Sequence, residues 1–249
     1  MGGTLSAIDT SSLSVTGSLT PSGGGSASLQ DVVFSPDGGK GYVSLFQSSA
    51  ANNVTVFSPD SLTSSATIDL TLPYGGGGPG NMVMANPTSG ATLWVMNNSW
   101  VEEGFTVVDA DTDTVLMHTD IGGGGGSIPG ACGTPDQSKV FIVLEDSPIL
   151  VYDTTSLTQT HEYAEIPDNY DCIVAPDGRA FFVSDTTGVI HKIDIDSLEP
   201  VGPEPEPPAE ETFGDTTSES GLIYTCSDCF ACPDEDWYIA DKAFDGDTS

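Results

Sequence analysis

The stretch "VVFSPDGGKGYVSLF", residues 32–46, decides the fold. It is typical of an apolar strand, a tight turn centred on Pro36 and a second apolar strand. The pattern returns in "MVMANPTSGATLWVM" (82–96), "ACGTPDQSKVFIVL" (131–144) and "CIVAPDGRAFFVS" (172–184). The prolines of the four copies follow one another at 51, 48 and 41 residues. A repeat of about 40 to 50 residues indicates a β-propeller blade.

A second signature follows each of these segments. It is a strand that ends in a polar turn, in "VFSPDSL" (56–62), "VVDADTD" (107–113), "VYDTTSL" (151–157) and "KIDIDSL" (192–198). An Asp or Ser at the strand end can accept hydrogen bonds from backbone N–H groups two residues further on. The outer strand follows each time, in "ATIDL" (66–70), "VLMHTDI" (115–121), "HEYAEIP" (161–167) and "EPVGPE" (199–204). Each unit therefore contains four strands.

The segment "AIDTSSLSVTGSLT", residues 7–20, is a fifth copy of the second signature, and no Pro-turn strand pair precedes it. We therefore expect the chain to begin halfway through a blade. A propeller normally pairs its first and last strands within one blade and so avoids open edges. The predicted fold class is all-β, a propeller of four-stranded antiparallel blades over residues 1–204, with four complete blades and one half blade from a larger ring.

The pattern of apolar strand, "PDG", "YV" or "FV", then "V-x-D-T" resembles the YVTN-type β-propeller repeats of prokaryotic secreted and surface-layer proteins. The resemblance covers roughly residues 5–204. Copies depart from the pattern where Thr88-Ser89-Gly90 replaces "DG" and where Asp136-Gln137 lacks the glycine. Propellers carry many activities, so the resemblance implies a scaffold and leaves its function open.

The last part of the chain differs in composition. Residues 205–220 are rich in proline and glutamate, which predicts a stiff, solvated linker. Residues 221–249 follow as a Cys-rich segment that ends in "AFDGDTS". This ending resembles the start of discoidin-like (coagulation-factor C-type) domains, β-sandwiches that mostly bind glycans or lipid head groups. The resemblance implies a truncated module in which Asp245 and Asp247 hold a structural Ca²⁺, the one cofactor expected.

The charge of the chain excludes some partners. Five Lys and Arg oppose 37 Asp and Glu, a formal net charge of −32 at pH 7. Phosphate backbones and anionic membrane surfaces repel such a chain, so nucleic acid is excluded as a partner. No apolar run approaches the roughly 18 residues of a membrane span, which excludes direct membrane insertion. The acidic, Ser- and Thr-rich composition fits a surface kept soluble in high salt, one that collects divalent cations, or a merely acidic secreted protein.

Three of the five cysteines, Cys226, Cys229 and Cys232, form a C-x₂-C-x₂-C motif. A metal or iron–sulfur site would need a fourth ligand at suitable spacing, so disulfides in an exported module are favoured. Cys132 and Cys172 lie on the first strands of successive blades and face opposite sides of those strands. We therefore expect them to be small buried residues and not a bridge.

Enzyme signatures are absent from the sequence, which predicts no enzymatic activity. His118, His161 and His191 lie in different blades without metal-ligand spacing. "DADTD" (109–113) lacks the glycine and distal glutamate of a calcium loop and aligns with the polar turn of the other blades. The glycine runs at 75–80 and 122–130 lack the Gly-Lys-Ser/Thr of a phosphate loop and fall at links between blades.

A ligand is expected at the loops that follow the second strand of each blade and at the links between blades. Alternating antiparallel strands bring these loops to one face, where binding residues collect on a rigid scaffold. The candidate binding residues are Tyr74, Trp100, Glu102, Glu103, Glu145, Asp146, Asp168 and Tyr170. Aromatic faces beside carboxylates suit a sugar ring or a cation, although covering the loops or contacting a neighbouring subunit would use the same residues.

These observations predict an extracellular or cell-surface modular protein. Its propeller acts as a binding or spacing scaffold and the terminal module as a glycan-binding adhesion domain, with a surface glycan or protein as partner. The alternatives are a lactonase- or quinoprotein-like propeller enzyme with an appended carbohydrate-binding domain, and a structural subunit of a surface layer, filament or virion. The oligomeric state stays open.

Overall fold

The computed structural model describes residues 3–21, 28–46, 53–70, 77–85, 90–99, 104–121, 128, 130–144, 148–163, 169–184 and 188–199. The chain divides into two units after Gly202, and all described residues belong to the first. The predicted linker at 205–220 and the Cys-rich segment at 221–249, including Asp245, Asp247, Cys226, Cys229 and Cys232, lie outside the described residues. Every regular element among the described residues is a β-strand, and this part of the chain contains no helix that could span a membrane.

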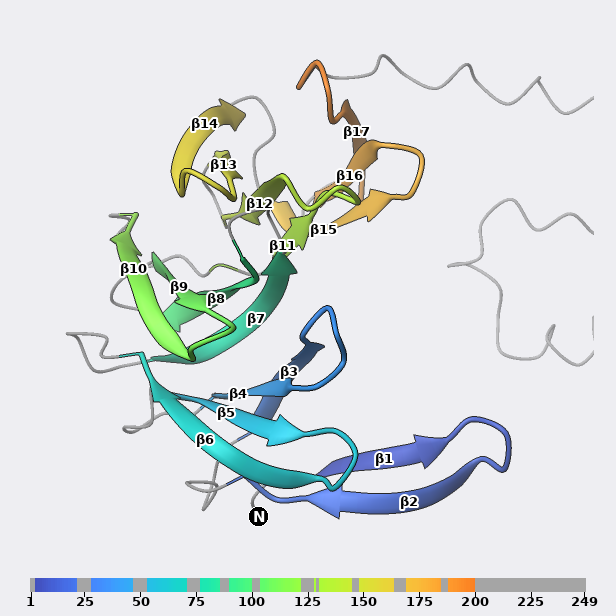
Figure 1. Cartoon of the computed structure of the whole chain (residues 1–249). Coiled ribbons are helices and arrows are strands. Elements are labelled where there is room, and N and C mark those ends of the chain that lie inside the picture. Colours follow the sequence, from blue (N-terminus) through green and yellow to red (C-terminus); the bar gives the residue numbers. More distant parts are fainter. Residues whose placement is uncertain are drawn as a thin grey trace, which may run out of the picture. The chain divides into compact units, whose positions relative to one another are not determined.

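The strands form successive antiparallel sheets in chain order, as Figure 1 shows. A hairpin of β1 (Leu5–Asp9) and β2 (Ser14–Leu19) comes first. Three four-stranded sheets follow: β3 (Ser28–Phe34), β4 (Gly41–Phe46), β5 (Asn53–Ser58) and β6 (Thr63–Asp69); β7 (Gly77–Ala85), β8 (Thr92–Ser99), β9 (Gly104–Asp109) and β10 (Thr114–Asp120); β11 (Gly130–Gly133), β12 (Lys139–Val143), β13 (Ile149–Asp153) and β14 (Thr158–Tyr163). The last sheet contains β15 (Asn169–Ala175), β16 (Arg179–Ser184) and β17 (Ile190–Asp194).

The Pro-turn strands lie where neighbouring sheets meet. β7 contacts β3 and β4, β11 contacts β7, and β15 contacts β11 and β12. β3, β7, β11 and β15, the first strand of each Pro-turn pair, are end strands of their sheets. The Pro-turn strands therefore form the edge along which neighbouring sheets meet.

The core is divided into layers, because both faces of the middle sheets are buried. Tyr42, Val54 and Val56 of the β3–β6 sheet pack against Leu93 and Val108 of the next sheet. The two following junctions repeat the arrangement with Trp94 and Phe141 in the place of Tyr42. Cross-strand partners such as Tyr42 and Val56 share a face, and adjacent residues alternate between faces. Each sheet therefore has a forward face toward the next sheet and a backward face toward the previous one.

The structure differs from the sequence prediction at the start of the second repeat, and one predicted strand lies almost wholly outside the described residues. The described strands of the fourth repeat are β15, β16 and β17, and its expected outer strand at 199–204 has only Glu199 among the described residues. β7 begins at Gly77, which pairs with Ser99, so residues 77–80 of the 75–80 glycine run belong to a strand and not to a link. The glycine run can extend the strand because Gly adopts extended backbone as readily as turn geometry.

The polar turns between the third and fourth strands share one geometry. In the first of them, the Leu13 N–H donates to the Asp9 carbonyl at 2.7 Å. The residue at this turn position has a φ between 51° and 57° in every repeat: Leu13, Leu62, Asp113, Leu157 and Leu198. Few non-Gly residues adopt this left-handed conformation, so hydrogen bonds and packing must hold each turn in place.

Candidate functional site

Of the eight predicted ligand-binding residues, only Tyr170 falls within the described residues. Tyr170 lies on β15 and is 59% exposed, and its role as a ligand contact stays a prediction. Tyr74, Trp100, Glu102, Glu103, Glu145, Asp146 and Asp168 fall between the described segments. Because the strands of each sheet are antiparallel, the last residues of β4, β8 and β12 and the first residues of β7 and β11 lie at the same end of their sheets. The described side chains that interact most extensively lie at the other end.

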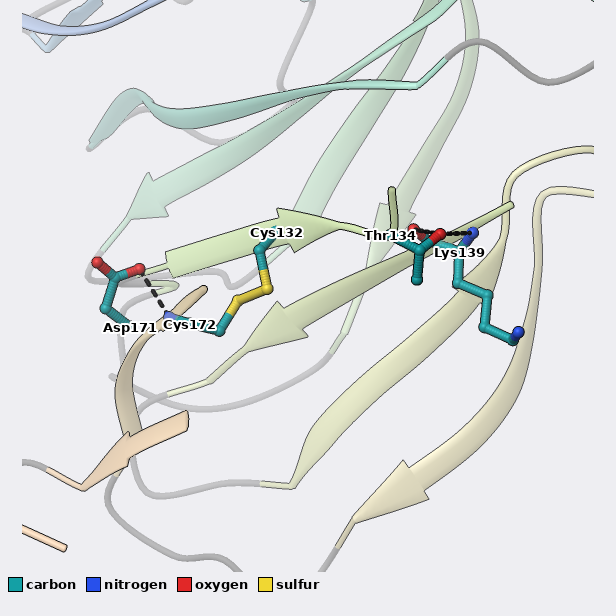
Figure 2. Close-up of a disulfide and its surroundings, with 5 residues drawn as sticks. All are labelled: Cys132, Thr134, Lys139, Asp171 and Cys172. Atoms are coloured by element: carbon teal, nitrogen blue, oxygen red, sulfur yellow. Dashed lines mark hydrogen bonds between the residues drawn. A yellow bond between two sulfur atoms is a disulfide. The ribbon is translucent and has the colours of Figure 1, made fainter. Parts of the chain in front are cut away.

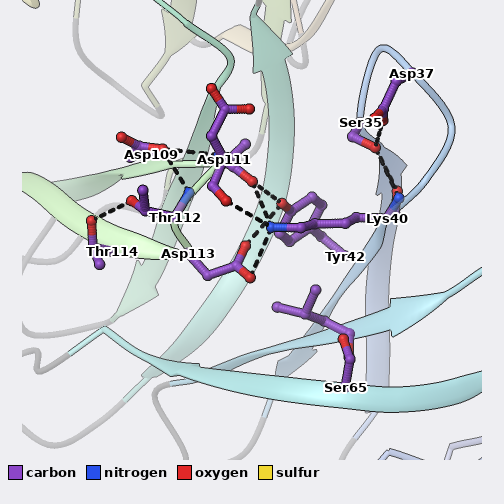
Figure 3. A network of polar contacts seen from close by, with 12 residues as sticks. Ser35, Asp37, Lys40, Tyr42, Ser65, Asp109, Asp111, Thr112, Asp113 and Thr114 are labelled. Carbon is purple, nitrogen blue, oxygen red and sulfur yellow. Dashed lines mark hydrogen bonds and ion pairs between the residues drawn. The ribbon is translucent and has the colours of Figure 1, made fainter.

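A network of polar contacts joins two sheets at that end (Figure 3). The Lys40 ammonium, just before β4, donates to the Asp113 carboxylate at 2.9 Å and to the carbonyls of Ala110 and Asp111 at 2.9 and 3.2 Å. The Tyr42 hydroxyl lies 2.9 Å from the Ala110 carbonyl and 3.1 Å from Asp113 Oδ1. Burial and then the Asp113 charge raise the pKa of Tyr42, so it stays a neutral donor. All three N–H donors of the Lys40 ammonium are bonded to the next sheet, so Lys40 links the β3–β6 sheet to the β7–β10 sheet.

Lys40 finds a partner on the next sheet because Asp113 occupies a turn position that holds leucine in the other repeats. In the neighbouring repeats the left-handed turn residue is a leucine that packs on the preceding sheet, as Leu157 does on the Trp94 layer and Leu198 on the Phe141 layer. In the β7–β10 sheet this residue is Asp113, and Lys40 and Tyr42 of the preceding sheet supply its partners. A polar contact therefore replaces an apolar one at an equivalent junction.

Several carboxylates have a lowered pKa, and each is explained by a turn. The Asp9 pKa falls to about 2 because the Ser11 hydroxyl and the Ser12 N–H donate to its carboxylate. Hydrogen bonds from Ser156 and Ser197 likewise lower the pKa of Asp153 and Asp194, and the Thr112 N–H lowers that of Asp109. The predicted capping by the Asp at the strand end is confirmed, and "DADTD" serves as such a turn. These shifts are structural and do not mark catalytic acids.

The innermost strands carry a second set of carboxylate contacts. Asp31 accepts hydrogen bonds from the N–H of Val32 on its own strand and from the N–H of Met82 on β7, both at 2.7 Å. Asp171 occupies the same repeat position on β15 and accepts from the Cys172 N–H at 2.8 Å. Ser44 donates to the Gly80 carbonyl at 2.7 Å and thereby bonds the same pair of sheets as Asp31. Asp31 and Ser44 therefore hold the β3–β6 and β7–β10 sheets together at their edges, whereas the hydrogen bond of Asp171 stays within its own strand.

A disulfide joins Cys132 on β11 to Cys172 on β15 (Figure 2). The expectation that these cysteines do not form a bridge is wrong. They do face opposite sides of their strands, since Cys132 pairs across β12 with Phe141 on the forward face and Cys172 pairs with Phe182. A bridge between stacked sheets requires a forward-facing residue on one sheet and a backward-facing residue on the next. The opposite orientation therefore permits the bond.

The histidines do not form a site. His118 Nδ1 lies 3.0 Å from the Thr106 hydroxyl within one sheet, and the His161 ring contacts Tyr163 within another. Among the described segments, no group of three or more His, Cys, Asp or Glu side chains is arranged to hold a metal ion. The residues that sequence reasoning missed are Lys40 and Asp113. The departure of Asp113 from the repeated leucine was the available signal.

No protein-family model matches the chain, and no curated protein matches it. Solved structures do resemble it. The hydrazine synthase of Kuenenia stuttgartiensis is 13% identical with a TM-score of 0.58, over 76% of this chain and 56% of that chain. The WD40 repeats of RRP9 are 13% identical with a TM-score of 0.55, over 72% of this chain and 51% of that one. The fold is a β-propeller.

A third similar structure is the dihydro-heme d1 dehydrogenase NirN in complex with DHE, 20% identical with a TM-score of 0.56, over 76% of this chain and 39% of that chain. The propeller-like neighbours thus include both enzymes and WD40 repeats. The present chain spans 39 to 56% of the length of these three proteins. At these identities the likeness establishes the propeller fold with four-stranded blades and does not specify the YVTN subtype.

Proposed function

We propose that this chain is part of a non-catalytic extracellular or cell-surface protein whose propeller serves as a binding and spacing scaffold. The observation that carries the proposal is the Cys132–Cys172 bond between successive blades. Disulfides persist in oxidising compartments and are rare in reducing ones. A covalent bond between blades also suits a scaffold that must keep its shape outside the cell.

The use of polar groups within the blades supports a scaffold. The carboxylates of Asp9, Asp109, Asp153 and Asp194, whose pKa values are lowered, cap turns. The Lys40 ammonium has no donor left for a substrate. Enzyme sites normally leave such groups available to the ligand. The Tyr170 side chain on β15 is 59% exposed and is the described candidate residue that fits a surface contact.

The two glycosylation-type sequons of the chain do not add to this support. Asn97 of the Asn97-Asn98-Ser99 sequon is 7% exposed within β8, and Thr55 of the Asn53-Val54-Thr55 sequon is fully buried. A glycan on Asn97 would be incompatible with the folded blade, whereas Asn53 itself is half-buried. The proposal of an exported protein therefore depends on the disulfide and on the acidic surface.

The disulfide tests the compartment. The protein is taken from its native source under alkylating conditions, digested without reduction and analysed by mass spectrometry. We expect the peptides that contain Cys132 and Cys172 to be linked, and to separate after reduction. Both cysteines recovered in alkylated form would contradict an oxidising location.

The binding role is tested separately. We expect the Trp100→Ala and Glu103→Ala double variant to lose glycan or Ca²⁺ binding by at least tenfold, because loop aromatics and carboxylates supply the contacts. The matched control is Leu116→Ala on the outer strand β10, which should bind as the unaltered chain does. Unchanged binding by the loop variant, at an unchanged melting temperature, would reject this loop site and leave the scaffold proposal intact.

A further inference from the structure

The strand that follows each polar turn carries a β-bulge at the same place. The register of β2, β6, β10 and β14 against the preceding strand shifts there by one residue. The extra residue at the shift is Thr16, Ser65, Leu116 or Thr160. A bulged residue has no cross-strand partner, so its side chain decides how the position is used.

A hydroxyl group closes three of these four bulges. The bulged side chain donates to a carbonyl of the preceding strand at 3.2 or 3.3 Å, in the pairs Thr16 and Ala7, Ser65 and Val56, and Thr160 and Val151. Leu116 has no hydroxyl and cannot make this bond. Since a hydrogen bond of this kind stabilises the hairpin, the leucine brings no equivalent benefit to the fold of its own sheet.

Leu116 and its neighbour Val115 are both exposed, at 49% and 42%, and we call them the apolar pair. The same two positions contain at least one polar residue in the other hairpins: Val15 and Thr16, Ser64 and Ser65, Gln159 and Thr160. Single exposed apolar residues are ordinary, but here two adjacent ones replace the polar pattern of the repeat. The β7–β10 sheet packs between two other sheets, so the apolar pair lies on its outer strand and not at a junction.

The turn that leads into β10 is rich in carboxylates. Asp109 ends β9, and Asp111 is exposed in the turn. The third carboxylate, Asp113, is paired with Lys40. Asp109 and Asp111 form no ion pair with a basic side chain in the described part of the chain. A molecule that covers the apolar pair therefore comes within a few residues of uncompensated negative charge.

Charge decides between the possible occupants of this surface. A second copy of the chain carries −32, and anionic head groups are negative too, so the turn repels both. Residues 203–249 contain one basic residue, Lys242, and are otherwise acidic. A polypeptide with Lys or Arg beside apolar residues is attracted by Asp109 and Asp111 and covers the apolar pair at the same time.

We propose that the apolar pair and the carboxylates of Asp109 and Asp111 form a docking site on the outer strand of the β7–β10 sheet. Its partner is a segment of a separate protein in which apolar residues are flanked by Lys or Arg. Burial of the apolar side chains supplies affinity, and the opposite charges orient the partner and speed its association. The inference is independent of glycan binding, because it uses none of the residues proposed for that role.

The probe is the synthetic peptide GKKLLKKG, added to the full chain at low salt and followed by NMR. We expect saturable binding with shifts of the amide signals of residues 108–117. The peptides GKKSSKKG, without apolar residues, and GEELLEEG, without basic ones, should each bind at least tenfold more weakly. Equal binding of GKKLLKKG and GKKSSKKG would mean that charge alone attracts the peptide and would overturn the proposal. The absence of binding, or equal shifts at residues 9–14 and 153–158, would overturn it as well.

Variants of the chain separate a binding role of Leu116 from a structural one. Leu116→Thr gives β10 the residue of two other bulges, so it should weaken peptide binding at least tenfold while the melting temperature stays the same or rises. Ser65→Thr on β6 is the matched control and should bind as the unaltered chain does. Unchanged binding by Leu116→Thr, or a lowered melting temperature, would overturn the proposal. A dimer in sedimentation experiments that Leu116→Thr dissociates would show that a second copy is the occupant and would also overturn it.

Discussion

At the scale of single residues, the turn after each third strand depends on one amino acid in the left-handed conformation. Leu13 and Leu157 have nearly the same φ, 53° and 56°, but their surroundings differ. Leu13 is 81% exposed, whereas Leu157 packs against the core layer of Trp94. The same backbone strain is therefore offset by packing at one site and by hydrogen bonds alone at the other.

This difference predicts opposite effects of one substitution. Leu13→Gly should raise the free energy of unfolding by about 0.5–1 kcal/mol, because glycine adopts positive φ without strain. Leu157→Gly should lower it by about 1 kcal/mol, because the lost apolar contacts exceed the relief of strain. Urea denaturation of the two variants provides the comparison. The same sign for both would show that packing of the turn leucine does not matter.

The Asp9 carboxylate gives a prediction on pH. Its pKa is about 2 in the folded chain, below the ordinary value of 3.8. The hydrogen bonds therefore stabilise the fold above pH 3.8, and their contribution is lost as the pH falls toward 2. NMR titration of Ser11→Ala should find the Asp9 pKa closer to its ordinary value, since the Ser11 hydroxyl is the largest cause of the shift. Ser18→Ala on β2 serves as the control and should leave it unchanged.

At the scale of elements, neighbouring sheets are joined by interchangeable kinds of contact. Leucine packs at most turn positions, the Lys40–Asp113 pair joins the β3–β6 and β7–β10 sheets, and a disulfide joins the last two. The ion pair is partly exposed, with Lys40 and Asp113 side chains 33% and 22% accessible. Solvent screening limits what such a pair contributes.

We expect Lys40→Met to destabilise the chain by about 1 kcal/mol, because Asp113 loses its partner in a partly buried position. Adding Asp113→Leu to that variant should restore most of the stability by recreating the apolar turn contact of the other repeats. Thermal and urea denaturation of the single and double variants form a double-mutant cycle. Additive losses would mean that the two residues do not interact.

Removal of the disulfide has a larger expected effect. Cys132 and Cys172 are 40 residues apart, and closing a loop of that size raises the free energy of the unfolded chain by about 4 kcal/mol through lost conformational entropy. Cys132→Ala with Cys172→Ala should lower the unfolding free energy by about that amount. The variant should unfold at the same denaturant concentration with or without reductant, whereas the unaltered chain should not.

The sequence predicted the elements well because the Pro turn and the Asp turn each impose one geometry wherever they occur. Repetition made the four units visible, and alternation assigned each side chain to a face. The disulfide was missed because orientation was judged within a strand, whereas the bond depends on which faces of two sheets oppose each other. The Lys40–Asp113 contact was missed because residues 73 positions apart share no local pattern. Most ligand-loop predictions stay predictions, because those residues are not described.

At the scale of the whole chain, charge dominates. A net charge of −32 on 249 residues destabilises a compact state through repulsion among carboxylates. Added salt screens this repulsion, and the Debye length falls from about 30 Å at 0.01 M to about 3 Å at 1 M.

We therefore expect the melting temperature to rise by several degrees between low and molar NaCl, with KCl giving the same rise. CaCl₂ at millimolar concentration should raise it further than NaCl of equal ionic strength if the chain also binds the ion. Calorimetry in low-salt, NaCl, KCl and CaCl₂ buffers measures both the screening by salt and the binding of Ca²⁺. A melting temperature that stays flat from low to molar salt would contradict the electrostatic account.

The bond between β11 and β15 also determines how the chain responds to force. If the chain is stretched from its ends, the residues between Cys132 and Cys172 cannot extend, because the sulfur–sulfur link carries the load past them. At about 3.5 Å per residue, the 40-residue separation corresponds to about 14 nm of contour length, which the disulfide prevents from extending. Reduction would release that length in one step. A thiol reagent would thus change the reach of this protein under tension as well as its stability.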